Sequence, residues 1–419
     1  MPSISKRGGK VPMSPFRKLI PFADKAKAAG KHVYHLNIGQ PDIETPAYAL
    51  QKVRETTFKI LEYSPAEGIA SYRRKLADYY RKFGIEAQAN EIIVTTGASE
   101  AILFAMLACL DPGDEVIVPE PFYANYNGFA QIADVHIRPI TSYIDTGFAL
   151  PDVEAFESVI GPRTRAILIT NPSNPTGTFY SREVLEGLGS LARNYGIFLF
   201  ADEVYRDFCY DGNEFFSILN IPGIEEHAIL IDSISKRYSA CGARVGSIVT
   251  RNQQVLGAVL RYAKLRLSPP GFGQILAEAT LEMEDTYINE VRDEYRRRRD
   301  VVYGRLSRMQ GVVSYRPGGA FYCFAKFPVD SAEHFCQWLL EEFEHQGATV
   351  MLSPGEGFYA TPGLGVDEVR LAYVLNCHDL DAAMDCLEVA LKEYPYKKQA
   401  TQAATTGPAA RRPAPGPAF

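Results

Sequence analysis

The leading candidate for a catalytic role in this sequence is a lysine that directly follows an apolar strand candidate. Lys236 lies in the segment DSISKRYSACGARVG, which spans residues 232–246 and is rich in serine and glycine. A side chain at this point is held at the carboxyl edge of a parallel sheet, where α/β proteins bind their ligands. The amine of Lys236 is therefore a candidate nucleophile.

The residues around Lys236 are suited to an anion. Ser233 provides a hydroxyl group and Arg244 a guanidinium group, and both are good donors to phosphate. Gly242 and Gly246 allow the backbone to approach a ligand closely. An isolated lysine is usually a solvated surface residue, and these neighbours favour the functional interpretation instead.

Two polar segments that end strand candidates precede the lysine. Asn174 belongs to NPSNPTG, and Asp202 and Tyr205 belong to DEVY. Either segment alone is typical of an ordinary turn or of the start of a helix. Their order before Lys236 makes a shared ligand site the better interpretation.

The order NPTG, DEVY, SxSKxxxxxGxRxG resembles the class I and II aminotransferases of aspartate and aromatic type. These are fold-type I enzymes that depend on pyridoxal phosphate. The likeness extends from LNIGQPD, at residues 36–42, to VRLAYV, at residues 369–374. It implies pyridoxal 5'-phosphate as the cofactor and amino-group transfer in two half-reactions as the activity.

The resemblance also implies roles for the catalytic residues. Lys236 would hold the cofactor as a Schiff base and later move the proton of the substrate α-carbon. Asp202 would pair with the pyridine nitrogen and keep it protonated. Tyr205 and Asn174 would donate hydrogen bonds to the phenolic oxygen of the ring.

The implied phosphate site begins at the turn TTGASEA. Gly97, Ala98 and Ser99 open a helix there, and the backbone N–H groups of a helix N-terminus favour an anion. Ser233 and Arg244 would complete this site.

Aromatic residues are implied at two further places. Tyr63, in EYSPAEGI, resembles the tyrosine that reaches the phosphate of the neighbouring subunit, which implies a homodimer with shared active sites. Tyr123, in PEPFYANY, occupies the position of the aromatic that stacks on the pyridine ring, with Phe122 as the alternative.

The resemblance implies that the substrate side of the site rests on Asn174, already assigned to the cofactor ring, and on two further residues. Arg370, in EVRLAYV, resembles the arginine that binds the α-carboxylate in a bidentate manner, and Gly39, in LNIGQPD, lies beside the substrate by the same resemblance. The expected substrates are an L-amino acid, with aspartate or an aromatic amino acid as donor, and a 2-oxo acid such as 2-oxoglutarate. Arg17 and Lys18 are candidates to bind a distal carboxylate.

Two other activities remain open from the residues. A pyridoxal-phosphate-dependent β-lyase of the same fold would use the same residue types. A serine acyl hydrolase is a distant alternative, because Ser233 and Lys236 form an SxxK pair. That motif set also needs a KTG or KSG segment, and the sequence has neither.

The elements that must position these residues alternate between short β-branched runs and helical patterns. This alternation predicts an α/β fold in which a mostly parallel sheet of seven strands lies between helices, as in the large domain of aspartate aminotransferases. The seven strand candidates are Ile92–Thr96, Glu115–Pro119, Val135–Ile140, Arg165–Thr170, Ile197–Ala201, Ile229–Asp232 and Gly246–Thr250.

A smaller α+β domain is expected after the long charged helix at Tyr287–Met309. Its strand candidates are Val312–Phe324, Ala348–Leu352 and Glu368–Val374, and its helices Ala332–Gln346 and Leu380–Glu393. The expected organisation is an N-terminal arm at 1–45 that packs with the small domain, a large cofactor-binding domain at 46–300, and the small domain at 301–396. The Pro- and Ala-rich tail at 397–419 is expected to be disordered.

Composition excludes several classes of protein. The formal charge of −6, from 44 basic and 50 acidic residues, argues against a nucleic-acid partner. The longest apolar run, Ala101–Leu110, is too short to cross a membrane. The cationic N-terminus is not followed by an apolar signal region, so a cytoplasmic location is expected. Seven cysteines without a CxxC pair indicate neither a disulfide framework nor a metal site.

Overall fold

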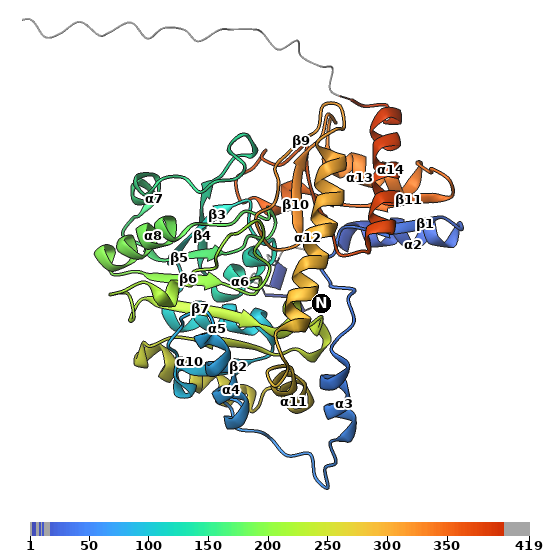
Figure 1. Cartoon of the computed structure of the whole chain (residues 1–419). Helices are drawn as coiled ribbons and strands as arrows, with labels where there is room; N and C mark the ends of the chain where they lie inside the picture. Colours follow the sequence, from blue (N-terminus) through green and yellow to red (C-terminus); the bar gives the residue numbers. More distant parts are fainter. Residues whose placement is uncertain (1, 6–7, 10, 12–16, 398–419) are drawn as a thin grey trace, which may run out of the picture.

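A seven-stranded sheet organises most of the chain in the computed structural model, which describes residues 2–5, 8–9, 11 and 17–397 (Figure 1). The sheet order is β2-β8-β7-β6-β5-β3-β4. The strands are β2 (Ile92–Thr95), β3 (Glu115–Glu120), β4 (His136–Thr141), β5 (Thr164–Thr170), β6 (Phe198–Asp202), β7 (Ala228–Ser233) and β8 (Gly246–Val249). All seven strand candidates of this sheet are confirmed, within a few residues at their ends.

The direction of the strands brings their carboxyl ends to one edge. Neighbouring strands from β7 to β4 pair in parallel, whereas β8 is antiparallel to both β2 and β7. Because β8 reverses direction between them, β2 runs the same way as β7. The segments after β2, β5, β6 and β7 therefore meet at the same edge of the sheet, where ligands bind in such folds.

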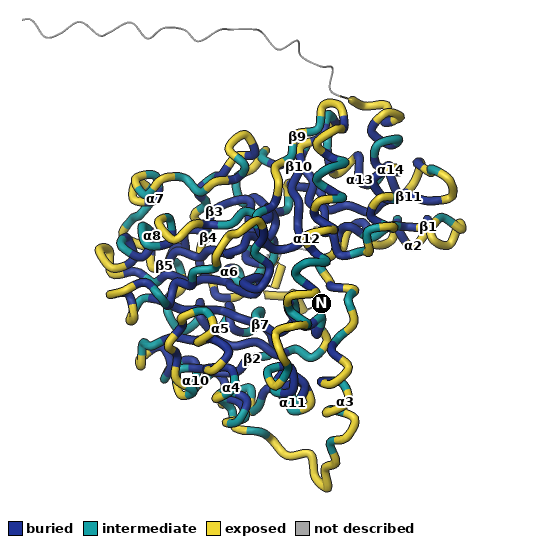
Figure 2. The backbone as a smooth tube through the Cα atoms, in the orientation of Figure 1, coloured by how far each residue is buried: buried dark blue, intermediate teal, exposed yellow. Residues whose placement is uncertain are grey.

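Each face of the sheet is covered by helices, as the apolar runs predict. Within β5, Ala166 and Leu168 pack in the core that includes α5 (Gly97–Cys109) and α10 (Gln253–Arg266). Ile167 and Ile169 point to the opposite core. That second core includes residues of α4 (Ala70–Arg81), α8 (Arg182–Tyr195) and α11 (Gly271–Thr280). Burial on both sides explains why the strands other than the edge strand β4 lack polar alternation (Figure 2).

The remaining helices of this region connect and flank the strands. They are α3 (Ala47–Glu55), α6 (Asn125–Ala133), α7 (Val153–Val159) and α9 (Ile234–Arg237). The long helix α12 (Thr286–Leu306) leads out of this region to a second one, drawn in orange and red in Figure 1.

The second region is an α+β structure built on a small antiparallel sheet with the order β12-β13-β10-β9. Its elements are β9 (Val313–Ser314), β10 (Tyr322–Lys326), α13 (Ala332–Glu341), β11 (Ala348–Met351), β12 (Ser353–Pro354), β13 (Glu368–Ala372) and α14 (Cys377–Glu393). The N-terminal elements α2 (Ile20–Ala28) and β1 (His32–His35) lie against it, and β1 pairs in parallel with β11 (Figure 1).

The expected single strand Val312–Phe324 is wrong. The chain leaves the sheet after β9, and a loop precedes β10. In that loop the N–H groups of Gly318 and Gly319 donate to the carbonyl oxygen of Gly177, at 2.9 and 3.0 Å. These bonds tie the loop to the large region and so interrupt the strand. The helix expected over Ala332–Gln346 likewise ends earlier, at Glu341.

A buried carboxylate joins the two regions at the end of β3. Glu120 is fully buried, and one of its oxygens accepts from the N–H groups of Ala360 and Thr361, at 2.8 and 3.1 Å. Its other oxygen accepts from the hydroxyl of Thr141 at 2.8 Å. The loop of the second region that contains residues 360–361 is thereby fixed to the large sheet.

Two further expectations remain, one about the C-terminal tail and one about helices that could cross a membrane. Of the tail expected to be disordered, only Lys397 belongs to the described part, where it forms a bridge with Val329; residues 398–419 lie outside it. Among the helices of the described residues, none combines the length and the apolar character that crossing a membrane requires.

Candidate active site

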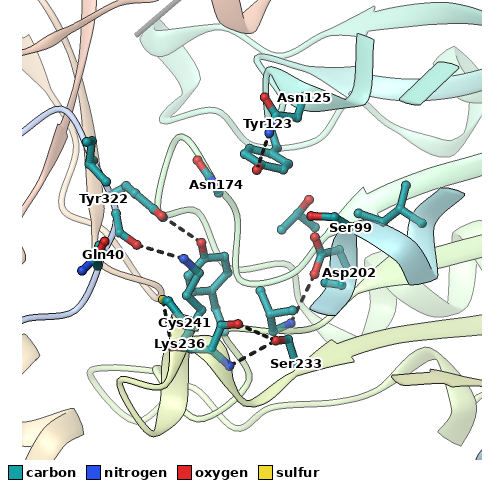
Figure 3. A pocket seen from close by; sticks show the side chains of 18 of the residues that line it. Gln40, Ser99, Tyr123, Asn125, Asn174, Asp202, Ser233, Lys236, Cys241 and Tyr322 are labelled. Carbon is teal, nitrogen blue, oxygen red and sulfur yellow. Dashed lines mark hydrogen bonds between the residues drawn. The ribbon is translucent and has the colours of Figure 1, made fainter. Parts of the chain in front are cut away.

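A cavity of about 510 Å³ opens at the carboxyl edge of the large sheet, and Tyr322 and Arg370 of the second region line its other side (Figure 3). Most of the predicted site residues line it, namely Gly39, Ala98, Ser99, Tyr123, Asn174, Asp202, Tyr205, Ser233, Lys236, Arg244 and Arg370. Gly97 lies directly behind this lining, and Tyr63 lies outside it. The cavity thus brings together residues that are separated by more than half of the chain.

Lys236 lies on the short helix α9, immediately after β7. Its amine donates a hydrogen bond to the carbonyl oxygen of Gly39 at 2.9 Å. Ser233 begins this helix, and its hydroxyl oxygen accepts from the N–H of Ser235 at 3.1 Å and lies 2.9 Å from the carbonyl oxygen of Val245. Since Ser233 and Lys236 are engaged with different partners, the geometry gives no support to a serine hydrolase.

Asp202 ends β6 and carries a buried carboxyl group. Burial raises its pKa to about 6, and the nearby Asp232 acts in the same direction. The hydroxyl of Tyr126, the N–H of Val204 and the amine of Lys236 lower the pKa. The group is therefore a carboxylate above pH 6, placed where a cationic partner in the cavity would stabilise it.

Two tyrosine hydroxyls meet in the wall of the cavity. The hydroxyls of Tyr205 and Tyr322 lie 2.8 Å apart, and burial raises the pKa of Tyr205 well above its usual value (Figure 3). Tyr205 is therefore a neutral hydrogen-bond donor at neutral pH. Tyr322 is not among the predicted site residues, because the sequence predicts one uninterrupted strand over the segment that contains it.

Arg370 extends from β13 to the large region. Its two terminal nitrogens donate to the side-chain oxygen of Asn174 at 3.0 Å and to the carbonyl oxygen of Asn37 at 2.6 Å. The guanidinium lies 4.7 Å from the centre of the Tyr322 ring. Burial lowers the pKa of Arg370, and because arginine titrates so far above neutrality the group stays cationic. It is thus a buried cation that faces the cavity and suits a carboxylate.

A cradle for an anion lies at the start of α5. Gly97 has a φ of +74°, and a Cβ added there would lie 2.5 Å from a terminal nitrogen of Arg244. A Cβ added at Gly246 would lie 2.6 Å from the backbone nitrogen of Ala98. Gly97 therefore lets the guanidinium of Arg244 approach the start of α5, and Gly246 lets the backbone of β8 do so; the first N–H groups of this helix lack partners within it.

The aromatic candidates differ in their placement. Tyr123 lines the cavity, and its hydroxyl accepts from the side-chain amide of Asn125 at 2.7 Å. Phe122 is buried in the core of the large region instead. Tyr63 is 76% exposed, on a loop whose residues 57–63 all face solvent.

The two cationic candidates of the N-terminal arm also differ. Arg17 lines the cavity, whereas Lys18 lies 3.4 Å from the carboxylate of Glu333, outside it. Other lining residues that sequence reasoning did not single out are Ile20, Asn37, Ile38, Gln40, Ile102, Asn125, Thr170, Val204, Ser235, Cys241 and Tyr322. Thr170 ends a predicted strand, and this position is the one signal that could have pointed to it.

Comparisons with known proteins agree with this geometry. The family model of aminotransferase class I and II matches residues 31–385. The chain is 31% identical to the aspartate aminotransferase of Pyrococcus horikoshii, over 93% of this chain and 97% of that protein. It is also 31% identical to aromatic-amino-acid aminotransferase 2 of Thermococcus litoralis, over 93% and 99%.

A solved structure shows the same fold. The aspartate aminotransferase of Thermotoga maritima superposes with a TM-score of 0.85 at 31% identity, covering 93% of this chain and all of that one. The lyase and hydrolase alternatives gain no support from these relatives. The chain belongs to the aminotransferase class I and II family and is a transaminase.

Proposed function

We propose that this aminotransferase uses pyridoxal phosphate, held in the cavity at the carboxyl edge of the large sheet, to move an amino group from an L-amino acid to a 2-oxo acid. The observation that carries the proposal is that Lys236, Asp202 and the cradle of Gly97 and Arg244 surround a single cavity. An amine, a carboxylate and an anion site are the three groups that this cofactor requires.

The residues present fit the chemistry of the cofactor. The cradle at the start of α5 offers the first N–H groups of the helix and the guanidinium of Arg244 as donors to a phosphate, and the absence of a Cβ at Gly97 makes room for that guanidinium. The buried carboxylate of Asp202 suits a protonated ring nitrogen. Tyr205 and Asn174 would hold the ring oxygen, and the ring of Tyr123 would stack on the cofactor.

When bound, pyridoxal phosphate supplies an aldehyde that bonds to amines and a ring that accepts the electrons of the substrate Cα–H bond. Lys236 would hold the cofactor covalently, and its released amine would take the proton from the substrate α-carbon and pass it on to the cofactor, because a proton returned to the same carbon would regenerate the amino acid. For this step the amine of Lys236 must break its hydrogen bond to the carbonyl oxygen of Gly39. Arg370 binds the substrate carboxylate, while Gly39 forms the wall beside it.

The substrate class follows from the cations of the cavity. In this proposal Lys236, Arg244 and Arg370 serve the cofactor and the α-carboxylate, which leaves Arg17 among the described cations of the lining. Arg17 would bind the distal carboxylate of aspartate as donor and of 2-oxoglutarate as acceptor. The names of the relatives, aspartate and aromatic aminotransferases, support aspartate or an aromatic amino acid as the donor.

A homodimer with shared active sites is part of the proposal. Phe58, Ile60, Leu61 and Tyr63 are all exposed on the loop between α3 and α4, which projects from the lower end of the molecule in Figures 1 and 2. A second copy of the chain would cover this apolar loop and receive Tyr63 at its phosphate site. Light scattering of the purified protein tests the dimer, and Tyr63→Phe should weaken cofactor binding.

The division into domains and the location belong to the same proposal. Residues 46–300 would form the cofactor-binding domain, while residues 301–396 and the arm at 1–45 would close over the substrate through Arg370. All seven cysteines are thiols, as is usual in reducing compartments, which supports a cytoplasmic location. Cell fractionation tests this location directly.

The test of the function starts with the purified protein and pyridoxal phosphate. Borohydride reduction should fix the cofactor to Lys236, as found by peptide mass, and Lys236→Ala should give no adduct. Lys392→Ala is the matched control, because Lys392 is an exposed lysine that pairs with Glu388. A protein that takes up no pyridoxal phosphate would contradict the proposal.

The reaction class is tested by adding an amino acid without any 2-oxo acid. A transaminase converts one equivalent and stops with the cofactor in its amine form, and a 2-oxo acid then restarts it. Continuous release of ammonia or pyruvate would instead show a lyase.

A further inference from the structure

Two hydroxyl groups are linked in a chain to Asp202, that of Tyr126 behind the cavity wall and that of Thr170, which lines the cavity. The hydroxyl of Tyr126, on α6, donates to the Oδ2 atom of Asp202 at 3.1 Å. The hydroxyl of Thr170, the last residue of β5, lies 2.7 Å from the same Tyr126 hydroxyl. Tyr126 is fully buried, and Thr170 faces Asp202 across the pairing of β5 with β6. The three hydrogen-bonding side chains therefore come from three adjacent elements, α6, β5 and β6.

Counting hydrogens gives this chain a direction. A hydroxyl group has one hydrogen to donate, and an ionised carboxylate has none. When Asp202 is ionised, Tyr126 uses its single hydrogen to donate to Oδ2. The contact between Tyr126 and Thr170 is then a hydrogen bond only if the Thr170 hydroxyl donates. The order Thr170 to Tyr126 to Asp202 is then the one in which both short contacts are hydrogen bonds, and such chains polarise each member toward the charge.

We propose that Tyr126, supported by Thr170, is a positioning residue that holds Asp202 as a carboxylate aimed at the ring nitrogen of the cofactor. The inference rests on the proposed cofactor site. Tyr126 touches neither the cofactor nor the substrate in this scheme, because it lies behind Asp202 and does not line the cavity. It acts through the charge and orientation of that carboxylate.

The surroundings of Asp202 explain why this support matters. The titratable groups that face it are Tyr123 and Tyr126 near α6, Asp232 on β7, Lys236 on α9 and Tyr205 after β6. Burial and Asp232 both favour the protonated form. Of the tyrosines, Tyr126 is the one whose hydroxyl bonds to the carboxylate in the described part of the chain. Without it, the pKa of Asp202 would rise above about 6.

The experiment measures pyridoxal phosphate binding to the cofactor-free protein by equilibrium dialysis between pH 5.5 and 9. Tyr126→Phe removes one hydroxyl group and little else. Tyr210→Phe is the matched control, because its buried hydroxyl donates to the backbone oxygen of Ala320 in the core of the second region. The cofactor and the other groups of the site are common to all variants, so differences between the curves report on Asp202.

In the wild type, affinity should fall as the pH drops and Asp202 gains its proton. In Tyr126→Phe this fall should begin at a higher pH, with binding about tenfold weaker at pH 7, which matches the loss of one hydrogen bond to a charged group. Thr170→Val should shift the curve in the same direction by less, and Thr170→Ser should restore it. Tyr210→Phe should follow the wild type.

A curve for Tyr126→Phe that coincides with the wild type would overturn the inference, as would equal shifts in Tyr126→Phe and Tyr210→Phe. If Tyr126→Phe does not fold, the comparison of Thr170→Val with Thr170→Ser decides in the same way. A wild type that binds no pyridoxal phosphate at any pH would overturn the proposed function and this inference together.

Discussion

The hydroxyl groups of Tyr205 and Tyr322 lie 2.8 Å apart, although Tyr205 follows a strand of the large sheet and Tyr322 begins a strand of the small one. The ring of Tyr322 also lies under the guanidinium of Arg370. One contact therefore links a residue proposed to hold the ring oxygen of the cofactor with the residue proposed to bind the substrate carboxylate.

Tyr322→Phe should reduce kcat/KM by about tenfold, because it removes one buried hydrogen bond and keeps the ring beneath Arg370. Steady-state kinetics measure this loss, and the melting temperature should change little. Tyr373→Phe is the control, since its hydroxyl donates to the backbone oxygen of Ala320 at 3.3 Å and it does not line the cavity. Equal losses in both variants would mean that the effect is general rather than specific to the site.

Arg370→Lys keeps the positive charge and removes the planar fork that donates to Asn174 and Asn37. We expect kcat/KM for amino acids to fall about a hundredfold or more, mainly through KM, because a bidentate bond to the carboxylate is lost. The affinity for pyridoxal phosphate should stay near that of the wild type. Unchanged kinetics would show that another group binds the substrate carboxylate.

Arg17→Gln separates dicarboxylic from other substrates. The side chain lines the cavity, so its loss should raise KM for aspartate and 2-oxoglutarate about tenfold or more and leave alanine or phenylalanine nearly unaffected. Lys18→Gln provides the comparison, because Lys18 pairs with Glu333 outside the cavity. If Arg17→Gln raises KM equally for all substrates, Arg17 does not bind the distal carboxylate.

Asp202→Asn should change how stability depends on pH in the cofactor-free protein. Burial raises the pKa of Asp202 to about 6 from 3.8, so the folded state binds this proton more tightly than the unfolded chain. From this group alone, the free energy of unfolding falls as the pH rises from about 4 to about 6. Above that range the asparagine variant should be more stable than the wild type by up to roughly 3 kcal/mol.

Urea titrations of the two proteins at pH 5, 6.5 and 8 measure this difference, which should shrink as the pH falls. A difference that does not vary with pH would show that Asp202 is ionised equally easily in both states.

The sequence could predict those site residues that follow parallel strands. Asp202 and Lys236 follow buried apolar runs, and the carboxyl ends of parallel strands share one edge of a sheet, so order along the chain translates into proximity. The phosphate cradle was predictable for the same reason, since Gly97 opens a helix after β2.

Contacts between the two regions could not be predicted in this way. Asn37 accepts a hydrogen bond from Arg370 with its backbone oxygen, so the type of its side chain gives no indication of this contact. Tyr322 reaches the cavity because the loop before it bonds to Gly177, more than a hundred residues earlier, and local patterns carry no information about that pairing. The preference for Arg17 over Lys18 likewise depends on where the arm lies against the cavity.

The bonds from Glu120 to the backbone of Ala360 and Thr361 restrict how the second region can move. A sliding displacement of that region would leave a buried carboxylate and two N–H groups without hydrogen-bond partners, at a cost of several kcal/mol. The bonds from Gly318 and Gly319 to Gly177 tie a second point of the same region to the large one, so a rotation about either point alone would break the bonds at the other. The part of the cavity wall that carries Arg370 is thus held by two separate anchors, which pre-organises its guanidinium for a carboxylate.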